Sequence, residues 1–132
     1  MVDVRFINPD TLAKPPSYSH VVEVTGPCRA VYISGQLGTD RDGKVAGDFR
    51  AQAVQVFENL KAALASVGAT FKDVVKVNSY LADIADLAVL REVRTPYLNA
   101  AALPASTTIA VGGFARPGAL LEIEVVAVLP LG

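Results

Sequence analysis

The chain has 132 residues and a net charge of −1, and 52% of its residues are hydrophobic against 19% that are charged. This length suits one domain with one core, and so large an apolar fraction excludes an intrinsically disordered chain. The 12 basic and 13 acidic residues form no block of like charge, so the sequence predicts no nucleic-acid partner. We therefore predict a single domain over residues 1–132.

Cysteine content and hydropathy narrow the class of protein further. Cys28 is the only cysteine, which excludes an intrachain disulfide and a CxxC metal site. No apolar run reaches the roughly 18 residues of a membrane span, and the N-terminus lacks the pattern of a signal peptide. We predict a cytoplasmic protein without a membrane partner. Its mean hydropathy of +0.38 predicts an oligomer, because monomers seldom expose large apolar patches.

Three strands and a long helix are predicted in the first half. The strands cover residues 4–7, 19–24 and 30–37. The helix covers residues 48–67, with Asp48 as its N-cap and Gly68 as the residue that ends it. Its apolar stripe consists of Phe49, Ala53, Val56, Leu60, Ala63, Leu64 and Val67. Polar residues, including Gln52 and Asn59, are predicted on the other side of the helix.

The second half predicts a strand, a helix and two more strands. Residues 73–82 alternate as a strand does. Either Asp83 or Asp86 is expected to cap the following helix, and Pro96 should kink that helix or end it early. Its apolar stripe consists of Leu87, Leu90, Val93 and Leu98.

Residues 107–111 and 119–129 complete the strands. The resulting order, β-β-β-α-β-α-β-β with a hairpin at each end, predicts an α+β fold. We expect a mixed sheet with both helices packed on one face.

Six short motifs in a fixed order resemble one family across nearly the whole chain. They are Tyr18-Ser19-His20; Ser34-Gly35-Gln36; the helix pattern of Gln52, Asn59, Leu60, Leu64 and Gly68; residues 73–77; Pro104-Ala105; and Leu121-Glu122-Ile123-Glu124. Together they resemble the RidA family, also called YjgF or endoribonuclease L-PSP. The resemblance implies the chorismate-mutase-like fold. It also implies a homotrimer whose sheets form a central barrel, with a small-molecule cleft between each pair of subunits.

The family resemblance also implies a chemistry. Its deaminases hydrolyse reactive enamines and imines, such as 2-aminoacrylate, to keto acids and ammonia. In those enzymes an arginine clamps the substrate carboxylate, and main-chain groups, a tyrosine and a water-handling glutamate complete the cleft. We expect Glu122 as the catalytic group and no metal or cofactor. The expected substrate-binding residues are Tyr18, His20, Ser34, Gly35, Arg91, Ser106 and Thr108.

Ser106 stands where those deaminases carry the arginine. A serine supplies neither the charge nor the paired donors of a guanidinium. Truncating one partner of a desolvated charge pair costs roughly 2–5 kcal/mol, or roughly 30- to several-thousand-fold in affinity. This predicts a less acidic ligand and little turnover of 2-iminopropionate. Alternatively Arg91, Arg94 or Arg116 replaces the missing arginine; otherwise all three lie at the surface or at an interface.

Two site residues leave further alternatives open. His20 is either a proton carrier or donor in the cleft, or a structural histidine at the trimer interface. Glu122 is either a general acid–base or a rim carboxylate paired with a lysine or arginine. A triad of Ser106, His20 and Glu122 is disfavoured, because the nucleophile-elbow pattern is absent. Two functions therefore remain: an enzyme acting on an imine or enamine, and a non-catalytic ligand-binding or regulatory homotrimer.

Overall fold

The computed structural model describes residues 1–132 and contains the predicted order of strands and helices. The elements are β1 (Asp3–Ile7), β2 (Val21–Thr25), β3 (Arg29–Leu37), α1 (Phe49–Ala65), β4 (Val74–Leu81), α2 (Leu87–Arg94), β5 (Ala105–Ala110) and β6 (Leu121–Leu129). Single 3-10 turns, η1 (Phe71–Asp73) and η2 (Ile84–Asp86), precede β4 and α2. None of these helices has the length and apolar character needed to cross a membrane.

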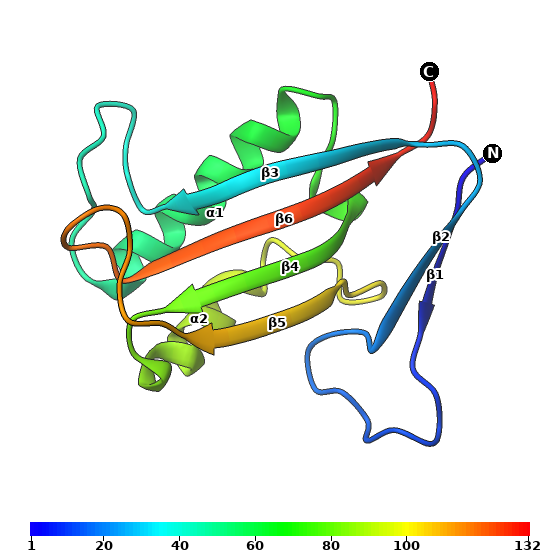
Figure 1. Cartoon of the computed structure of the whole chain (residues 1–132), viewed down its shortest axis with the longest axis horizontal. Coiled ribbons are helices and arrows are strands. Elements are labelled where there is room, and N and C mark those ends of the chain that lie inside the picture. Colours follow the sequence, from blue (N-terminus) through cyan, green and yellow to red (C-terminus); the bar gives the residue numbers. More distant parts are fainter.

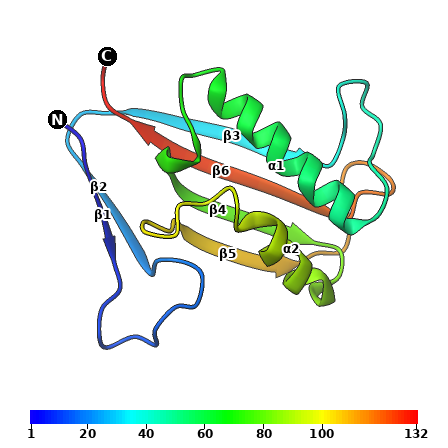
Figure 2. The same cartoon turned by 180° about the vertical axis from the view of Figure 1, so that it is seen from behind.

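Four strands form the main sheet, in the order β3-β6-β4-β5. β4 and β5 run parallel, and β6 is antiparallel to both of its neighbours. Figures 1 and 2 show both helices on one face of this sheet, which confirms the predicted α+β arrangement. The other face carries no helix.

The strand pairing differs from the prediction at the C-terminal end. β5 and β6 do not form a hairpin, because β6 inserts between β3 and β4. Every second side chain of β6 is buried, and its last three are buried in succession. So apolar a strand is most stable at the centre of the sheet, where both neighbours cover it. The 111–120 connection therefore passes over the end of β4 rather than forming a tight turn (Figure 1).

Both ends of α1 are formed as predicted. The Asp48 carboxylate accepts a hydrogen bond from the backbone N–H of Ala51 at 2.9 Å, which satisfies one of the free donors at the helix start. At the other end Gly68 has φ of +77°. The backbone N–H groups of Gly68 and Ala69 donate to Ala65 and Leu64. This is a Schellman motif, which needs the left-handed residue that glycine supplies.

The start of α2 is decided in favour of Asp83. Its carboxylate accepts from the backbone N–H of Ala85 at 2.9 Å and caps the η2 turn, whereas Asp86 makes no capping hydrogen bond. α2 ends at Arg94, two residues before Pro96, as expected. Leu98 lies beyond the helix and so is not part of its stripe.

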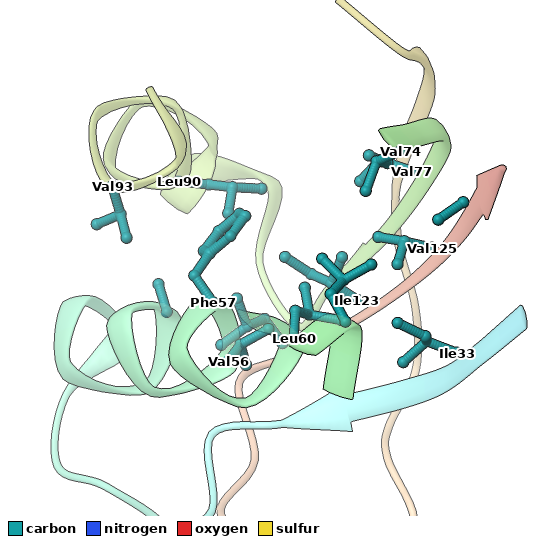
Figure 3. Close-up of a cluster of buried hydrophobic side chains, with 14 of the residues drawn as sticks. Ile33, Val56, Phe57, Leu60, Val74, Val77, Leu90, Val93, Ile123 and Val125 are labelled. Carbon is teal, nitrogen blue, oxygen red and sulfur yellow. The ribbon is translucent and has the colours of Figure 1, made fainter. Parts of the chain in front are cut away.

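The core lies between the helices and the sheet (Figure 3). Phe57 and Leu60 of α1, Leu90 of α2 and Ile123 of β6 are each at most 1% exposed. The ring of Tyr97 stacks on Phe57 with centroids 4.9 Å apart. Burying large side chains of this kind is worth about 1.5–3 kcal/mol each, so this layer holds both helices on the sheet.

Gln52 departs from the prediction, because it is 1% exposed rather than on the solvent side of α1. Its side-chain N–H groups donate to the carbonyls of Gly47 and Gly118, and its side-chain oxygen accepts from the backbone N–H of Leu120 at 2.8 Å. A buried amide is tolerated when its hydrogen bonds are made. Gln52 thereby ties the 111–120 connection, and hence the start of β6, to α1.

Candidate functional site

One group of predicted site residues lies on the helix-free face, where β3 ends and β6 begins. The pairing of β3 with β6 shifts register between Ile33 and Gln36, so Ser34 and Gly35 form a β-bulge of the kind that re-aims side chains near functional sites. A Cβ on Gly35 would lie 2.7 Å from Cδ of Glu122. The Glu122 side chain therefore lies directly over Gly35, in space that any larger residue would fill.

Glu122 and Glu124 share this face but have different partners. Glu124 accepts hydrogen bonds from Nδ2 of Asn78 at 3.1 Å and from the Tyr80 hydroxyl at 2.7 Å. The Glu124 bond is the main cause that raises the pKa of Tyr80. Glu122 is half-buried and makes no side-chain hydrogen bond or ion pair. Both carboxylates line a cavity of about 390 Å³ with Tyr80 and Phe114. Glu122 is thus the carboxylate left free for a ligand or water.

A second group lies at the opposite edge, between α2 and β5. A cavity of about 200 Å³ is lined by Ser17, Tyr18, Leu87, Arg91, Arg94, Ser106 and Thr108. Ser106 and Thr108 pair with Val77 and Ser79 of β4, whose side chains are buried. Both therefore lie on the helix-covered side of the sheet. The last turn of α2 places its arginines opposite them.

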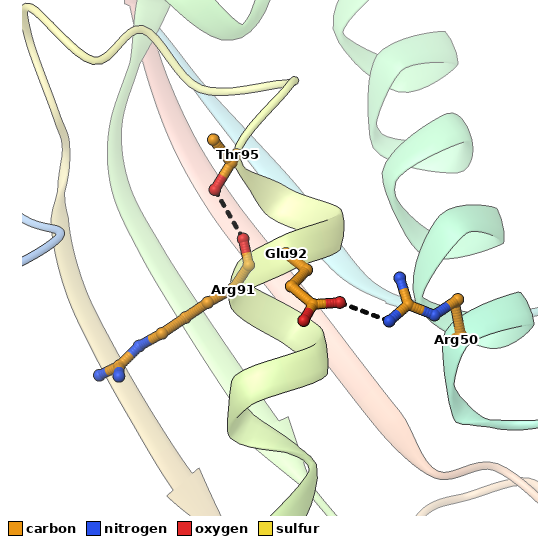
Figure 4. A network of polar contacts seen from close by, with 4 residues as sticks. All are labelled: Arg50, Arg91, Glu92 and Thr95. Carbon is orange, nitrogen blue, oxygen red and sulfur yellow. Dashed lines mark hydrogen bonds and ion pairs between the residues drawn. The ribbon is translucent and has the colours of Figure 1, made fainter.

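The two arginines make this cavity strongly positive. Arg94 is only 6% exposed, and Nη2 donates to the Ser17 hydroxyl at 3.1 Å. Burial, and then the charge of Arg91, lower the pKa of Arg94. The Arg91 side chain points away from the Arg50–Glu92 ion pair and toward β5 (Figure 4). No carboxylate lines the cavity, so its two positive charges have no counter-charge.

Arg116 is not part of this cavity. Its guanidinium donates to the Gly43 carbonyl, in the turn where Gly43 has φ of +81°. In that turn the Asp40 carboxylate accepts hydrogen bonds from the backbone N–H groups of Asp42 and Lys44, both at 2.9 Å. Of the three arginines considered as replacements for the missing one, Arg91 and Arg94 therefore line the same cavity as Ser106.

The structure separates the predicted site residues into two sets within one chain. Tyr18, Arg91, Ser106 and Thr108 lie together in the arginine cavity. Ser34, Gly35 and Glu122 lie together on the helix-free face.

His20 supports the first set without lining the arginine cavity. Nε2 of His20 donates to the Ala13 carbonyl at 2.6 Å, and its ring packs edge-on against Tyr18. His20 and Glu122 thus belong to different sets, and a Ser106–His20–Glu122 triad does not form within one chain. Arg94 was named from the sequence only as one of three alternatives. The sequence signal for Arg94 was its spacing: an arginine three residues after Arg91 lies on the same side of a helix.

The fold is that of a small α+β domain with two groups of polar residues, one on each face of the same sheet. The family model for Endoribonuclease L-PSP matches residues 10–129. The chain is 36% identical over 113 residues to a RutC family protein of Aquifex aeolicus, which covers 84% of this chain and 87% of the relative. It is also 36% identical over 113 residues to the 2-iminobutanoate/2-iminopropanoate deaminase of Mus musculus, covering 84% and 80%.

A solved structure agrees with the sequence relatives. The Rid-family protein YyfB of Yersinia pestis, described as of unknown function, superimposes with a TM-score of 0.86 at 36% identity, covering 96% of this chain and 98% of that one. The chain belongs to the RidA superfamily, and the family predicted from the six motifs is confirmed.

Proposed function

We propose that the chain binds a small imine or enamine bearing a negatively charged group and hydrolyses it to a carbonyl compound and ammonia. The observation that carries the proposal is the arginine cavity, in which Arg91 and Arg94 face Ser106 and Thr108 without a counter-charge. The mouse relative is named for two imino acids, 2-iminobutanoate and 2-iminopropanoate, which are carboxylates of this size.

The α2 arginines would perform the role of the arginine that Ser106 replaces. Burial is the main cause of the lowered pKa of Arg94, and repulsion by the neighbouring Arg91 guanidinium adds to it. A bound carboxylate relieves that repulsion and accepts directed N–H donors from both. The small Ser106 side chain leaves the room that an inward-pointing arginine would occupy. This favours an anionic ligand over the less acidic one expected from Ser106 alone.

Glu122 of a neighbouring copy of this chain is the group proposed to handle water, because within one chain it lies on the opposite face of the sheet from the arginine cavity. Its carboxylate accepts a proton as a water oxygen attacks the imine carbon, and the proton is then delivered to nitrogen. In the resulting carbinolamine the hydroxyl proton passes to the amino nitrogen, the C–N bond breaks as the carbonyl forms, and ammonia leaves, so one imine and one water give one carbonyl compound and one ammonia. An enamine first takes a proton at carbon to become the imine. General acid–base catalysis of this kind contributes about 10²–10⁴-fold.

The test is ammonia release from freshly generated 2-iminopropionate. We expect wild-type protein to accelerate release above the spontaneous rate, and Glu122→Gln to lower kcat by about 100-fold or more with KM little changed. Glu92→Gln, on the outer side of α2, is the matched control and should retain activity. Pyruvate binding without any acceleration by wild type would instead support the non-catalytic alternative.

A second variant tests the placement of Glu122. In Gly35→Ala the added Cβ meets the flexible Glu122 side chain rather than backbone, so the carboxylate must move while the fold remains. Misplacement by about 1 Å costs on the order of 100-fold in rate, and we expect a loss of that size in kcat with a nearly unchanged urea midpoint. Gly112→Ala, where a Cβ meets nothing, is the control. Full activity in Gly35→Ala would contradict the role of Glu122.

A further inference from the structure

The β1–β2 hairpin stands apart from the four-stranded sheet (Figures 1 and 2). β2 pairs only with β1, and β3 pairs only with β6, so each strand has one unpaired edge. Only residues 26–28 connect β2 to β3, a length that ordinarily joins two paired antiparallel strands. Two consecutive strands with free edges therefore do not pair with each other.

These unpaired strands also expose apolar side chains. Val21 and Val24 of β2 are 41% and 36% exposed, and Tyr32 of β3 is 77% exposed. Edge strands of this kind present open N–H and C=O groups that pair readily with another chain. The exposed strands thus have both the backbone groups and the apolar surface of an interface.

The far end of the hairpin is attached to the opposite edge of the main sheet. The Ser19 backbone N–H donates to the Pro104 carbonyl at 3.1 Å, just before β5. Ser17 accepts from buried Arg94 at 3.1 Å, and Tyr18 lines the arginine cavity. Because β3 and β5 are the two outer strands of the sheet, the hairpin cannot keep these contacts and also pair with its own β3.

The connection between β2 and β3 is stiff rather than loose. Gly26 has φ of +93°, and a Cβ there would lie 2.5 Å from the Met1 carbonyl oxygen. Pro27 follows and fixes its own φ. Short, constrained hinges of this kind promote the exchange of an element between copies of a chain.

We propose that the β1–β2 hairpin is exchanged between subunits, with β2 pairing antiparallel to β3 of a neighbouring copy of this chain. Exchange keeps the contact that a closed hairpin would make, and supplies it from a second chain. It satisfies both free edges and covers Val21, Val24 and Tyr32. The attachment of residues 17–19 to β5 and α2 of their own chain is retained.

The exchange also brings together the arginine cavity and the group formed by Ser34, Gly35 and Glu122. In an antiparallel pair the start of β2 lies beside the end of the neighbouring β3. Tyr18 and His20 immediately precede β2, whereas Ser34 and Gly35, with Glu122 above them, lie at the end of β3. One cleft then contains the arginine cavity of one chain and Glu122 of the next, so the site is incomplete in a single copy.

Disulfide trapping tests the exchange directly in a Cys28→Ala background. A three-residue connection places position 22 opposite 32 and position 24 opposite 30. We expect oxidised Val22→Cys/Tyr32→Cys and Val24→Cys/Ala30→Cys proteins to run as covalently linked multimers on a non-reducing gel. Monomeric bands in both, whether from intrachain bonds or from free thiols, would overturn the proposal.

A matched control and a mixing experiment complete the test. Phe6→Cys/Val22→Cys crosses the β1–β2 pair and should give only an intrachain bond. Co-expressed chains that carry either Val22→Cys or Tyr32→Cys should give a mixed disulfide, which a hairpin closed within each chain cannot form. Neither readout involves turnover, so the exchange can fail while the proposed hydrolysis stands, and the reverse.

Discussion

Replacing Arg94 by glutamine is expected to raise the KM for 2-iminopropionate by roughly 30- to several-thousand-fold, which corresponds to about 2–5 kcal/mol for truncating a desolvated charge pair. Arg94 is buried beside Arg91, without a carboxylate in the cavity, so a ligand anion would be its main counter-charge. Arg91→Ala should give the lower end of this range, because Arg91 is exposed and better screened. Steady-state ammonia release measures both variants.

Two controls separate anion binding from a structural role of Arg94. Arg94 also donates to the Ser17 hydroxyl, so Ser17→Ala removes that contact and leaves the charge. We expect Ser17→Ala to keep KM within a few-fold of wild type. Arg50→Ala breaks the exposed pair with Glu92, which is worth only about 0.2–1 kcal/mol of stability. If Arg94→Gln matched Ser17→Ala in KM, the arginine would be a loop anchor and not a ligand clamp.

The largest loss of stability is expected from Gln52→Ala. The truncation leaves three backbone groups without their hydrogen-bond partner: the N–H of Leu120 and the carbonyls of Gly47 and Gly118. Each buried polar group left unpaired costs about 1–3 kcal/mol, and we expect a total of about 3–5 kcal/mol in the free energy of unfolding. Urea denaturation measures this as a shift of the midpoint.

Gln55→Ala provides the matched comparison on the same helix. Gln55 is only partly buried and donates to Asn59 alone, so its loss should cost about 1 kcal/mol or less. Equal midpoints for the two variants would show that the Gln52 hydrogen bonds do not hold the 111–120 connection. A selective loss in Gln52→Ala would assign that role to the side chain.

Local chemistry made most elements of this fold predictable. Asp48 and Gly68 mark the ends of α1 because a carboxylate accepts free N–H groups and glycine adopts positive φ. Pro96 marks the end of α2 for an equally local reason. Gln52 was misplaced because a periodicity of apolar residues assigns every amide to the solvent side. The β5–β6 hairpin was wrong because strand pairing depends on which distant strand offers the better apolar neighbour.

The candidate site was also predictable only in part from the sequence. Sequence motifs were enough to identify the family and to single out Tyr18, Gly35, Glu122 and the unusual Ser106. They could not show which arginines lie beside Ser106, since helix α2 and strand β5 meet only in the folded chain.

The sequence by itself determined the family, the order of strands and helices, both ends of α1 and the C-terminal end of α2, because caps, turns and periodicity act over a few residues. Only the tertiary structure decided that Arg91 and Arg94 face Ser106, that Glu122 lies on the other face of the sheet, and that β2 is left without its neighbour β3. Those relations depend on which segments far apart in the sequence pack together. That packing is decided by how the whole chain buries its apolar side chains.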